Sequence, residues 1–383
     1  MGLARRVFFL AGAALAFPVL VIAFFCAVYA ATWHGVGVAG GVIASVVSTL
    51  AIIHGGRAGK RPRRIKTAWL VVAGASVTFL YFSATRAAKG RGGDPQLLVE
   101  HAFLDPDGQL PGASAANLFC EWDQVAIGTA LARWFDPKID ARQAKRIRQL
   151  TFPLYEAMSS DPAFADMGSV LAWAYSSVLS HAPAIGHYVA IVPRREEGRS
   201  GGFVVFLHGG AGNFSSLWYA LAPLARDHGH TLLCPSFRFG NWHEEGGVET
   251  IQRTIKQARS RFVPTPPRQV IVALSDAGPG AMRFVEKQPT LVKAVILLSA
   301  RFDSQELARG ASGGVWRDVP VLLVHGADDR RIPVRQARDA AGVLREAGAD
   351  VTLLVLEGED HSLFFSQRPR VLREIAVWLR DAR

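Results

Sequence analysis

Polar side chains that could together carry out acyl transfer occupy the second half of the chain. Ser275, the acidic pair Asp328-Asp329 and His361 each come just after a short apolar, β-branched run. A histidine can accept the proton of a serine hydroxyl while an acid holds and orients the imidazole. The sequence therefore offers a nucleophile, an orienting acid and a general base, in that chain order. Asp303, which follows another apolar run, is a less favoured candidate for the acid.

The residues around Ser275 fit a sharp turn between a strand and a helix. Such a turn needs small residues two positions before and two after the serine, and these are Ala273 and Ala277. The backbone N–H of Asp276 would then be one donor of an oxyanion hole. The alternative interpretation is a serine that caps a helix, which is common.

A glycine-rich segment supplies the second candidate donor. It reads His-Gly-Gly-Ala-Gly-Asn over residues 208–213 and follows the apolar run 203–207. Glycines let the backbone turn tightly and present its N–H groups to a small anion. We assign the second oxyanion donor to the N–H of Gly210.

The elements that would position these groups alternate between strands and helices from residue 186 onward. Apolar runs of this kind are buried on both faces, so the alternation predicts a mostly parallel sheet covered by helices. In such a sheet functional groups gather at the carboxyl ends of the strands. The predicted strands are 187–192, 203–207, 230–235, 269–274, 292–298, 320–325 and 351–356, and the predicted helices are 214–228, 246–262, 277–287, 333–347 and 367–382.

Residues 203–383 resemble the α/β-hydrolase superfamily. Four segments carry the resemblance: the oxyanion strand and loop at 204–210, the nucleophile elbow at 272–278, the acid segment at 320–334 and the histidine loop at 357–361. The stretch 320–361 is most similar to the prolyl-oligopeptidase and dienelactone-hydrolase branches. The resemblance implies an α/β-hydrolase fold and a serine hydrolase that cleaves an ester or amide through an acyl-enzyme.

The resemblance also assigns roles to single residues. The family's acid is the third residue after the glycine, which selects Asp329 over Asp328. Ser275 is then the nucleophile and His361 the general base. The chain departs from the family where alanine replaces the usual glycine on either side of the serine, and where Asp276 places a carboxylate beside it.

Two other functions remain open at this point. An acyltransferase would use the same Ser275, Asp329 and His361 with an acceptor other than water. A catalytically silent hydrolase fold could serve as a membrane-tethered binding module, although it would have no need to keep all three side chains. No metal-ligand set, phosphate loop or dinucleotide fingerprint is present, so we predict neither a cofactor nor a metal.

The net charge of +11 is confined to the N-terminal quarter of the chain. Residues 1–93 hold 11 Lys or Arg and no Asp or Glu, so residues 94–383 hold 32 groups of each sign. A nucleic-acid binder would carry a basic stripe on its folded domain. We therefore expect no nucleic-acid partner and look instead to a membrane.

Apolar runs free of charge at 7–33, 35–53 and 67–85 predict about three transmembrane helices. With the N-terminus in the cytoplasm, eight Lys and Arg of the flanking loops lie inside and three outside, which is the favoured orientation. This predicts an integral protein of the cell (inner) membrane, with residues 86–383 outside the cytoplasm. If the third run does not span, the enzyme lies in the cytoplasm instead.

The predicted organisation is a transmembrane region at 1–91, a linker and helical segment at 92–185, and a hydrolase domain at 186–383. Residues 86–113 are expected to be a linker with one short ordered piece, and 115–134 and 140–182 to be helical. This helical segment either covers the active-site face or packs on the side of the next domain.

The substrate is expected to be a small-molecule ester or amide that is lipophilic near the scissile bond. Aromatic residues follow several predicted strand ends, where loops would line a pocket. At least half of them would be core residues on general grounds. Cys26 and Cys234 are expected to be small buried thiols, and a disulfide between Cys120 and Cys234 stays open. The aromatic residues in question are Phe214, Trp218, Phe237, Phe239, Trp242, Phe364 and Phe365.

Overall fold

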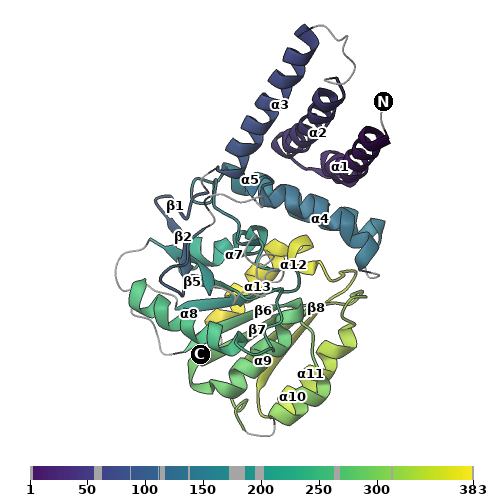
Figure 1. Ribbon diagram of the computed structural model, residues 1–383. Coiled ribbons are helices and arrows are strands. Elements are labelled where there is room, and N and C mark those ends of the chain that lie inside the picture. The colour runs from purple at the N-terminus through teal and green to yellow at the C-terminus, as the bar shows by residue number, and fades with distance from the viewer. Residues whose placement is uncertain are drawn as a thin grey trace. The chain divides into compact units, whose positions relative to one another are not determined.

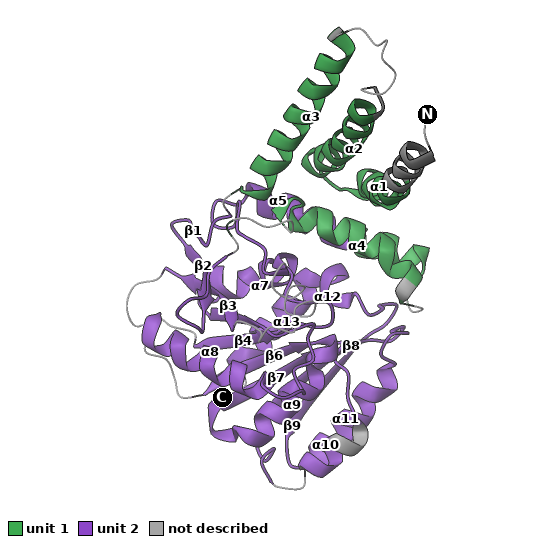
Figure 2. Cartoon of the chain, viewed as in Figure 1, with its two compact units in different colours: residues 1–87, 111–148 green, residues 88–110, 149–383 purple. Residues whose placement is uncertain are grey.

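The chain divides into two compact units, which are coloured separately in Figure 2. Unit 1 comprises residues 1–87 and 111–148, and unit 2 comprises residues 88–110 and 149–383. The computed structural model describes residues 3–55, 63–86, 88–110, 112, 117–136, 139–171, 186–194, 202–262, 268–311 and 314–381.

Unit 1 is helical. Helices α1 (Leu3–Tyr29), α2 (Trp33–Gly55) and α3 (Arg63–Ala84) are followed by α4 (Glu121–Phe135) (Figure 1). Helices α2 and α3 run antiparallel, because His34 near the start of α2 lies 6.0 Å, centroid to centroid, from Phe79 near the end of α3. The first part of α5 (Ala141–Ser160) also belongs to unit 1.

Two helices among the described residues are long and apolar enough to cross a membrane, where the sequence predicts about three. They are Trp33–Ile53 and Arg64–Ala84. The first predicted run lies in α1, in which the described apolar stretch is Ala14–Tyr29. Many of their large apolar side chains are exposed, which is unusual for the core helices of a soluble protein.

Unit 2 is built on one nine-stranded sheet with the order β1-β2-β3-β5-β4-β6-β7-β8-β9. The strands from β5 to β9 pair in parallel, whereas β1, β2 and β3 pair antiparallel at one side. Most of the sheet is therefore parallel, as predicted. The strands are β1 (Arg91–Gly93), β2 (Leu97–Phe103), β3 (His187–Pro193), β4 (Phe203–Leu207), β5 (Thr231–Ser236), β6 (Gln269–Leu274), β7 (Val292–Leu298), β8 (Pro320–Gly326) and β9 (Asp350–Leu356).

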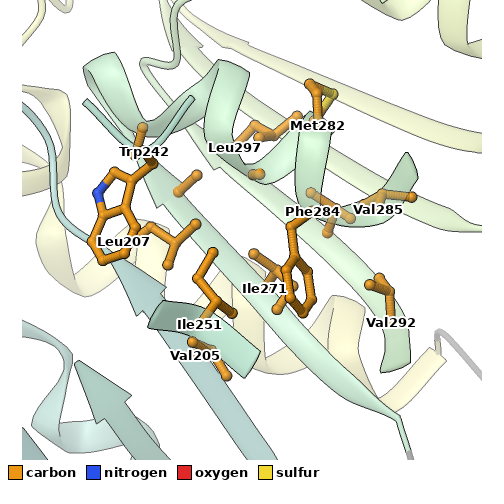
Figure 3. Close-up of a cluster of buried hydrophobic side chains, with 14 of the residues drawn as sticks. Val205, Leu207, Trp242, Ile251, Ile271, Met282, Phe284, Val285, Val292 and Leu297 are labelled. Atoms are coloured by element: carbon orange, nitrogen blue, oxygen red, sulfur yellow. The ribbon is translucent and has the colours of Figure 1, made fainter. Parts of the chain in front are cut away.

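Helices cover both faces of this sheet, because its central strands are apolar on both sides. Val205 and Leu207 of β4 join one apolar cluster, part of which is drawn in Figure 3, while Val204 and Phe206 join the other. The first cluster contains buried residues of α8 (Gly247–Arg261), α9 (Gly278–Lys287), α10 (Ser304–Ala311) and α11 (Val334–Glu346). The second contains those of α7 (Ser215–Arg226), α12 (Leu363–Ser366) and α13 (Arg368–Asp381).

The sheet extends beyond the segment in which sequence patterns predict strands. β1 and β2 lie within residues 86–113, which the sequence indicates as a linker with one short ordered piece. Leu97 and Val99 are fully buried, but the polar Glu100 and His101 beside them interrupt the apolar run and hide the strand. The predicted domain boundary at residue 186 thus omits two strands of the sheet.

The predicted middle helical segment is shared between the units. Its described part in unit 2 packs against the second apolar cluster through Leu154, Ala163 and Phe164. An ion pair adds to this packing: the guanidinium of Arg226 in α7 lies 3.0 Å from the carboxylate of Asp161. The part of the predicted helix at 172–182 lies outside the described residues.

All three cysteines are free. Cys234 is fully buried in β5, and the pKa of its thiol is raised by burial. Cys120 lies in unit 1 and its Sγ is 3.1 Å from the carboxylate of Asp123. The structure has no Cys120–Cys234 disulfide, and Cys26, expected to be buried, is partly exposed.

Candidate functional site

The candidate residues follow the carboxyl ends of parallel strands, on the same side of the sheet. Ser275 follows β6 directly, Asp329 comes three residues after β8, and His361 comes five residues after β9. β8 and β9 are neighbours, with Gly326 paired to Leu356 at their carboxyl ends. The acid and the histidine are thereby brought to adjacent strand ends.

A continuous chain of hydrogen bonds joins these three side chains. The Oγ of Ser275 lies 2.9 Å from Nε2 of His361, and Nδ1 of His361 lies 2.8 Å from Oδ2 of Asp329. With the Nδ1 proton donated to the carboxylate, Nε2 is free to accept the serine proton. The carboxylate is fully buried and the imidazole is partly exposed. Asp328 and Asp303, the other candidate acids, are both exposed.

The surroundings of Asp329 keep its carboxylate ionised. Burial raises the pKa of this group, but the contacts of the carboxylate with His325, with His361 and with the backbone N–H of Ile332 outweigh burial and hold the pKa well below its usual range. Its Oδ1 accepts hydrogen bonds from the backbone N–H groups of Arg331 and Ile332, at 2.9 and 2.8 Å. The carboxylate is thus fixed in place and charged.

His325 forms a second contact to this carboxylate. Its Nε2 donates to the carbonyl of Ile332 at 2.8 Å and lies 3.4 Å from Oδ2 of Asp329. The ring of His325 is almost fully buried. Its position on β8, four residues before Asp329, gave no signal of this role in the sequence.

Ser275 has the backbone conformation of a strained turn. Its φ is +55°, which is uncommon for a residue other than glycine and is found at functional sites. A strained strand-to-helix turn presents a serine hydroxyl at the top of the sheet. The helix that follows, α9, begins at Gly278.

Ala273 and Ala277 can occupy the positions two residues before and after Ser275, because the tightest backbone contacts of this turn are at Gly278 and Gly280. Ala277 has φ −76°, which any residue can adopt. A Cβ at Gly278 would lie 2.1 Å from the carbonyl oxygen of Arg301, and one at Gly280 would lie 2.1 Å from Cβ of Trp242. Gly278 and Gly280 therefore leave room for the segments that pack against the start of α9.

The loop that holds Gly210 is fixed by its neighbours. Trp242 donates its indole N–H to the carbonyl of His208 at 2.9 Å. Gly240, with φ +93°, packs so closely that an added Cβ would lie 2.3 Å from the carbonyl oxygen of Gly209. A Cβ at Gly209 would in turn lie 2.9 Å from Cβ of Ser275, so this loop runs directly beside the serine.

The carboxylate of Asp276 lies against the same loop and is paired with a cation. A Cβ at Gly210 would be 2.9 Å from Oδ2 of Asp276, and Nε of Arg301 is 3.2 Å from Oδ1. Arg301 also donates its backbone N–H to the carbonyl of Ser275 at 2.9 Å. Sequence patterns identify Asp276 but not this counter-ion, because Arg301 follows a different strand, β7.

Only some of the aromatic residues that were expected to line a substrate pocket are exposed. Phe214, Phe239 and Phe365 are partly exposed, so they can still contact a ligand. The others are buried and belong to the two apolar clusters, so they are core residues. The buried ones are Trp218, Phe237, Trp242 and Phe364.

The strand order and the turn at the serine together decide the fold. Parallel strands β5 to β9 are flanked by antiparallel ones, helices cover both faces, and a serine with positive φ stands between β6 and α9. The chain order serine, aspartate, histidine agrees with this arrangement. Unit 2 has the α/β-hydrolase fold. Among the described residues of the whole chain, no three His, Cys, Asp or Glu side chains form a group that could hold a metal ion.

Known sequences match parts of this α/β-hydrolase unit. Residues 301–382 match the model of the prolyl oligopeptidase family. A stretch of 49 residues is 45% identical to a protein of Oryza sativa subsp. japonica described as a probable isoprenylcysteine alpha-carbonyl methylesterase. That stretch spans 13% of this chain and 12% of the rice protein.

Solved structures of hydrolases also resemble this chain. An esterase of Pyrococcus furiosus is 12% identical with a TM-score of 0.43, covering 51% of this chain and 88% of its own. A Pyrobaculum calidifontis esterase is 14% identical with a TM-score of 0.42, covering 52% and 81%. A monoacylglycerol lipase of Paleococcus ferrophilus is 16% identical with a TM-score of 0.39, covering 48% and 95%.

Proposed function

We propose that this protein is a serine hydrolase that cleaves a carboxylic ester, or an amide, through an acyl-enzyme. The observation that carries the proposal is the hydrogen-bonded chain from Ser275 through His361 to Asp329, at 2.9 and 2.8 Å. The prolyl oligopeptidase match over 301–382 includes two of these three residues and supports the same chemistry.

In the first half of the reaction, Oγ of Ser275 attacks the substrate carbonyl carbon while Nε2 of His361 takes the hydroxyl proton. The N–H groups of Gly210 and Asp276 stabilise the oxyanion. The carbonyl then re-forms, the bond to the alcohol or amine breaks, and His361 returns the proton to the leaving group. Asp329 stays ionised throughout and stabilises the imidazolium.

In the second half, a water molecule gives its proton to Nε2 of His361 and its oxygen attacks the acyl-enzyme. The bond to Oγ of Ser275 breaks, the serine regains a proton and the carboxylic acid is released. An acceptor other than water would make the enzyme an acyltransferase. Product analysis with and without added alcohols separates these two outcomes.

The assignment of Ser275 is tested by covalent labelling with a fluorophosphonate, using Ser299 as the matched control. Both serines follow a strand of the sheet and both have positive φ, +55° and +44°. Ser275→Ala should abolish labelling and lower kcat by about 10⁴-fold or more. Ser299→Ala removes an equally strained serine and should label as the wild type does. Labelling that survives in Ser275→Ala overturns the assignment.

For the substrate, we propose a lipophilic ester. The rice relative is described as a methylesterase, and Phe214, Phe239 and Phe365 remain partly exposed near the strand ends. Comparison of p-nitrophenyl esters from acetate to decanoate should show kcat/KM rising with chain length. A maximum at acetate would count against a lipophilic substrate.

We further propose that unit 1 anchors the protein in the cell membrane, with the N-terminus in the cytoplasm and unit 2 outside. Two helices of spanning length and the apolar stretch Ala14–Tyr29 of α1 support this. Basic residues of the N-terminal quarter gather at the start of α1 and from the α2–α3 connection into the first turn of α3. Such residues are retained on the cytoplasmic side.

Reporter fusions after Arg86, before the first strand of unit 2, test the orientation. Alkaline phosphatase is active only outside the cytoplasm, and green fluorescent protein fluoresces when it remains inside. We expect an active phosphatase fusion and a dark fluorescent one. The reverse pattern would place unit 2 in the cytoplasm and overturn the orientation.

A further inference from the structure

The first turn of helix α4 is fixed to the turn between α1 and α2. The carboxylate of Asp123 accepts hydrogen bonds from the backbone N–H groups of Ala31 and Thr32, at 2.9 and 2.8 Å, and from the hydroxyl of Thr32 at 2.7 Å. Asp123 is fully buried, and Gly35 leaves room for its carboxylate. A side chain of α4 therefore satisfies backbone donors at the start of α2.

The last turn of α4 lies beside α1. The ring of Trp134 packs edge-on against that of Phe25, with 6.3 Å between the centroids. Phe25 precedes the end of α1 at Tyr29 by four residues, which is about 6 Å along the helix axis at 1.5 Å per residue. From its beginning at the α1–α2 turn, α4 thus continues alongside the end of α1.

Aromatic residues mark this end of the α1–α3 bundle as a membrane–water boundary, given the anchoring proposed above. Tyr29 ends α1, Trp33 begins α2 and is 90% exposed, and Tyr81 near the end of α3 is 64% exposed. Tyr and Trp are enriched at both interfaces of a bilayer. Arg64 and Lys66, in contrast, lie at the opposite end of α3.

The exposed apolar side chains of α4 lie on the face that meets the bundle. Asp123, Leu131 and Trp134 are separated by eight and three residues, which places them on one side of a helix. Asp123 on that face contacts the α1–α2 turn, and Leu131 and Trp134 are 36% and 71% exposed. Two large apolar side chains therefore project toward the side on which the membrane helices lie.

We propose that α4 is an interfacial helix, with Leu131 and Trp134 inserted into the boundary between lipid headgroups and acyl chains. This proposal rests on the membrane anchoring proposed above. A lipid surface suits these side chains because an indole ring prefers that depth, and an apolar helix face gains free energy when it leaves water. Arg133, exposed beside them, has the charge expected next to headgroup phosphates.

The test measures quenching of tryptophan fluorescence by brominated lipids. The full chain is reconstituted into phosphatidylcholine vesicles whose acyl chains carry bromine near the headgroup. The chain has nine tryptophans, so the contribution of one is obtained by difference. Trp134→Phe should lower the bromine-quenched part of the emission, because it removes a ring held at that depth. Trp316→Phe, which removes a fully buried indole of unit 2, should leave that part unchanged.

Alkaline carbonate extraction separates this proposal from the anchoring on which it rests. Retention in the membrane together with a smaller quenched part in Trp134→Phe supports both. Retention with equal quenching in wild type and Trp134→Phe overturns the placement of α4 alone. Release of the wild-type chain by carbonate overturns the anchoring and α4 together. Wild-type fluorophosphonate labelling of each variant shows that unit 2 has folded.

Discussion

Asp276 places a negative charge beside the position where we propose that negative charge develops. Left alone, its carboxylate would oppose an oxyanion held by Gly210. Arg301 offsets this charge at 3.2 Å, and both side chains are partly exposed, so solvent screens the pair. The electrostatic potential at the proposed oxyanion hole is then set by the Asp276–Arg301 ion pair as a whole.

A double-mutant cycle tests this compensation. Arg301→Ala leaves Asp276 unpaired and should lower kcat roughly threefold to tenfold, which is modest because of the screening. Asp276→Asn should cost little, and Arg301→Ala should cost nothing further in that background. Equal losses from Arg301→Ala in both backgrounds would show that Arg301 acts through something other than the charge of Asp276. Added salt should shrink the loss in the single variant.

At the scale of elements, the glycine-rich loop after β4 depends on a second loop, the one that follows β5. Gly240 in that second loop touches the backbone of Gly209 and Gly210. Trp242 donates its hydrogen bond from the same loop. The position of the proposed oxyanion donor therefore depends on the contact between two loops that are thirty residues apart in sequence.

Gly240→Ala should displace the proposed oxyanion loop, with Gly246→Ala as the matched control. Both glycines have positive φ, +93° and +87°, so both variants bear the backbone strain of an alanine there. Only at Gly240 would the new Cβ meet the loop, because the nearest atom at Gly246 is 3.5 Å away in Phe237. We expect kcat to fall about 10²- to 10³-fold in Gly240→Ala, the effect typical of losing one oxyanion donor.

Gly246→Ala should keep kcat within about twofold of the wild type on the same argument. Thermal unfolding of both variants serves as the control for strain. Similar losses of Tm with similar kcat would contradict a role for Gly240 in placing the loop.

At the scale of the whole molecule, unit 2 buries imidazoles that must stay neutral. Burial lowers the pKa of both His101 and His208 to about 4. His208 donates from Nδ1 to the carbonyl of Gly209 and accepts a hydrogen bond from the backbone N–H of Phe237 at Nε2. A proton added to Nε2 would point at that N–H group and would break the hydrogen bond. Nδ1 of His101 lies 2.9 Å from Nε2 of His187, and that pair likewise has room for one proton between the rings.

The stability of unit 2 should therefore fall as the pH decreases through the range from about 6.5 to 4. An unfolded histidine binds a proton below about pH 6.5, whereas folded His101 and His208 do so only near pH 4. The unfolded state then binds more protons, and each group costs about 1.4 kcal/mol per pH unit. Carboxylates change the free energy of unfolding mainly below pH 5. Between pH 6.5 and 5 the change in stability therefore reports on the histidines.

Urea unfolding of the full chain in detergent, followed by tryptophan fluorescence, measures this slope. His208→Gln keeps an acceptor for the N–H of Phe237 but cannot take up the proton, so its midpoint should depend less steeply on pH. A wild-type midpoint that is constant from pH 7.5 to 5 would contradict the prediction.

The sequence alone determined the elements that local patterns encode. The strand at 269–274 and the helix after it were predictable because an apolar run ends at a small-residue turn around Ser275. Ser275 and His361 could be selected from the order of strand ends. Asp329 was preferred over Asp328 only through the family resemblance, and the structure buries Asp329 and exposes Asp328.

The tertiary structure decided what depends on pairing between distant segments. β2 joins the sheet through its partner β3, some 90 residues later, and neither Glu100 nor His101 reveals this locally. Arg301 reaches Asp276, and Trp242 reaches His208, because parallel strands bring separate loops to one edge. Periodicity along a chain reports which side chains are buried, but not which segments meet. Those contacts follow from strand order and register, and only the folded sheet contains that information.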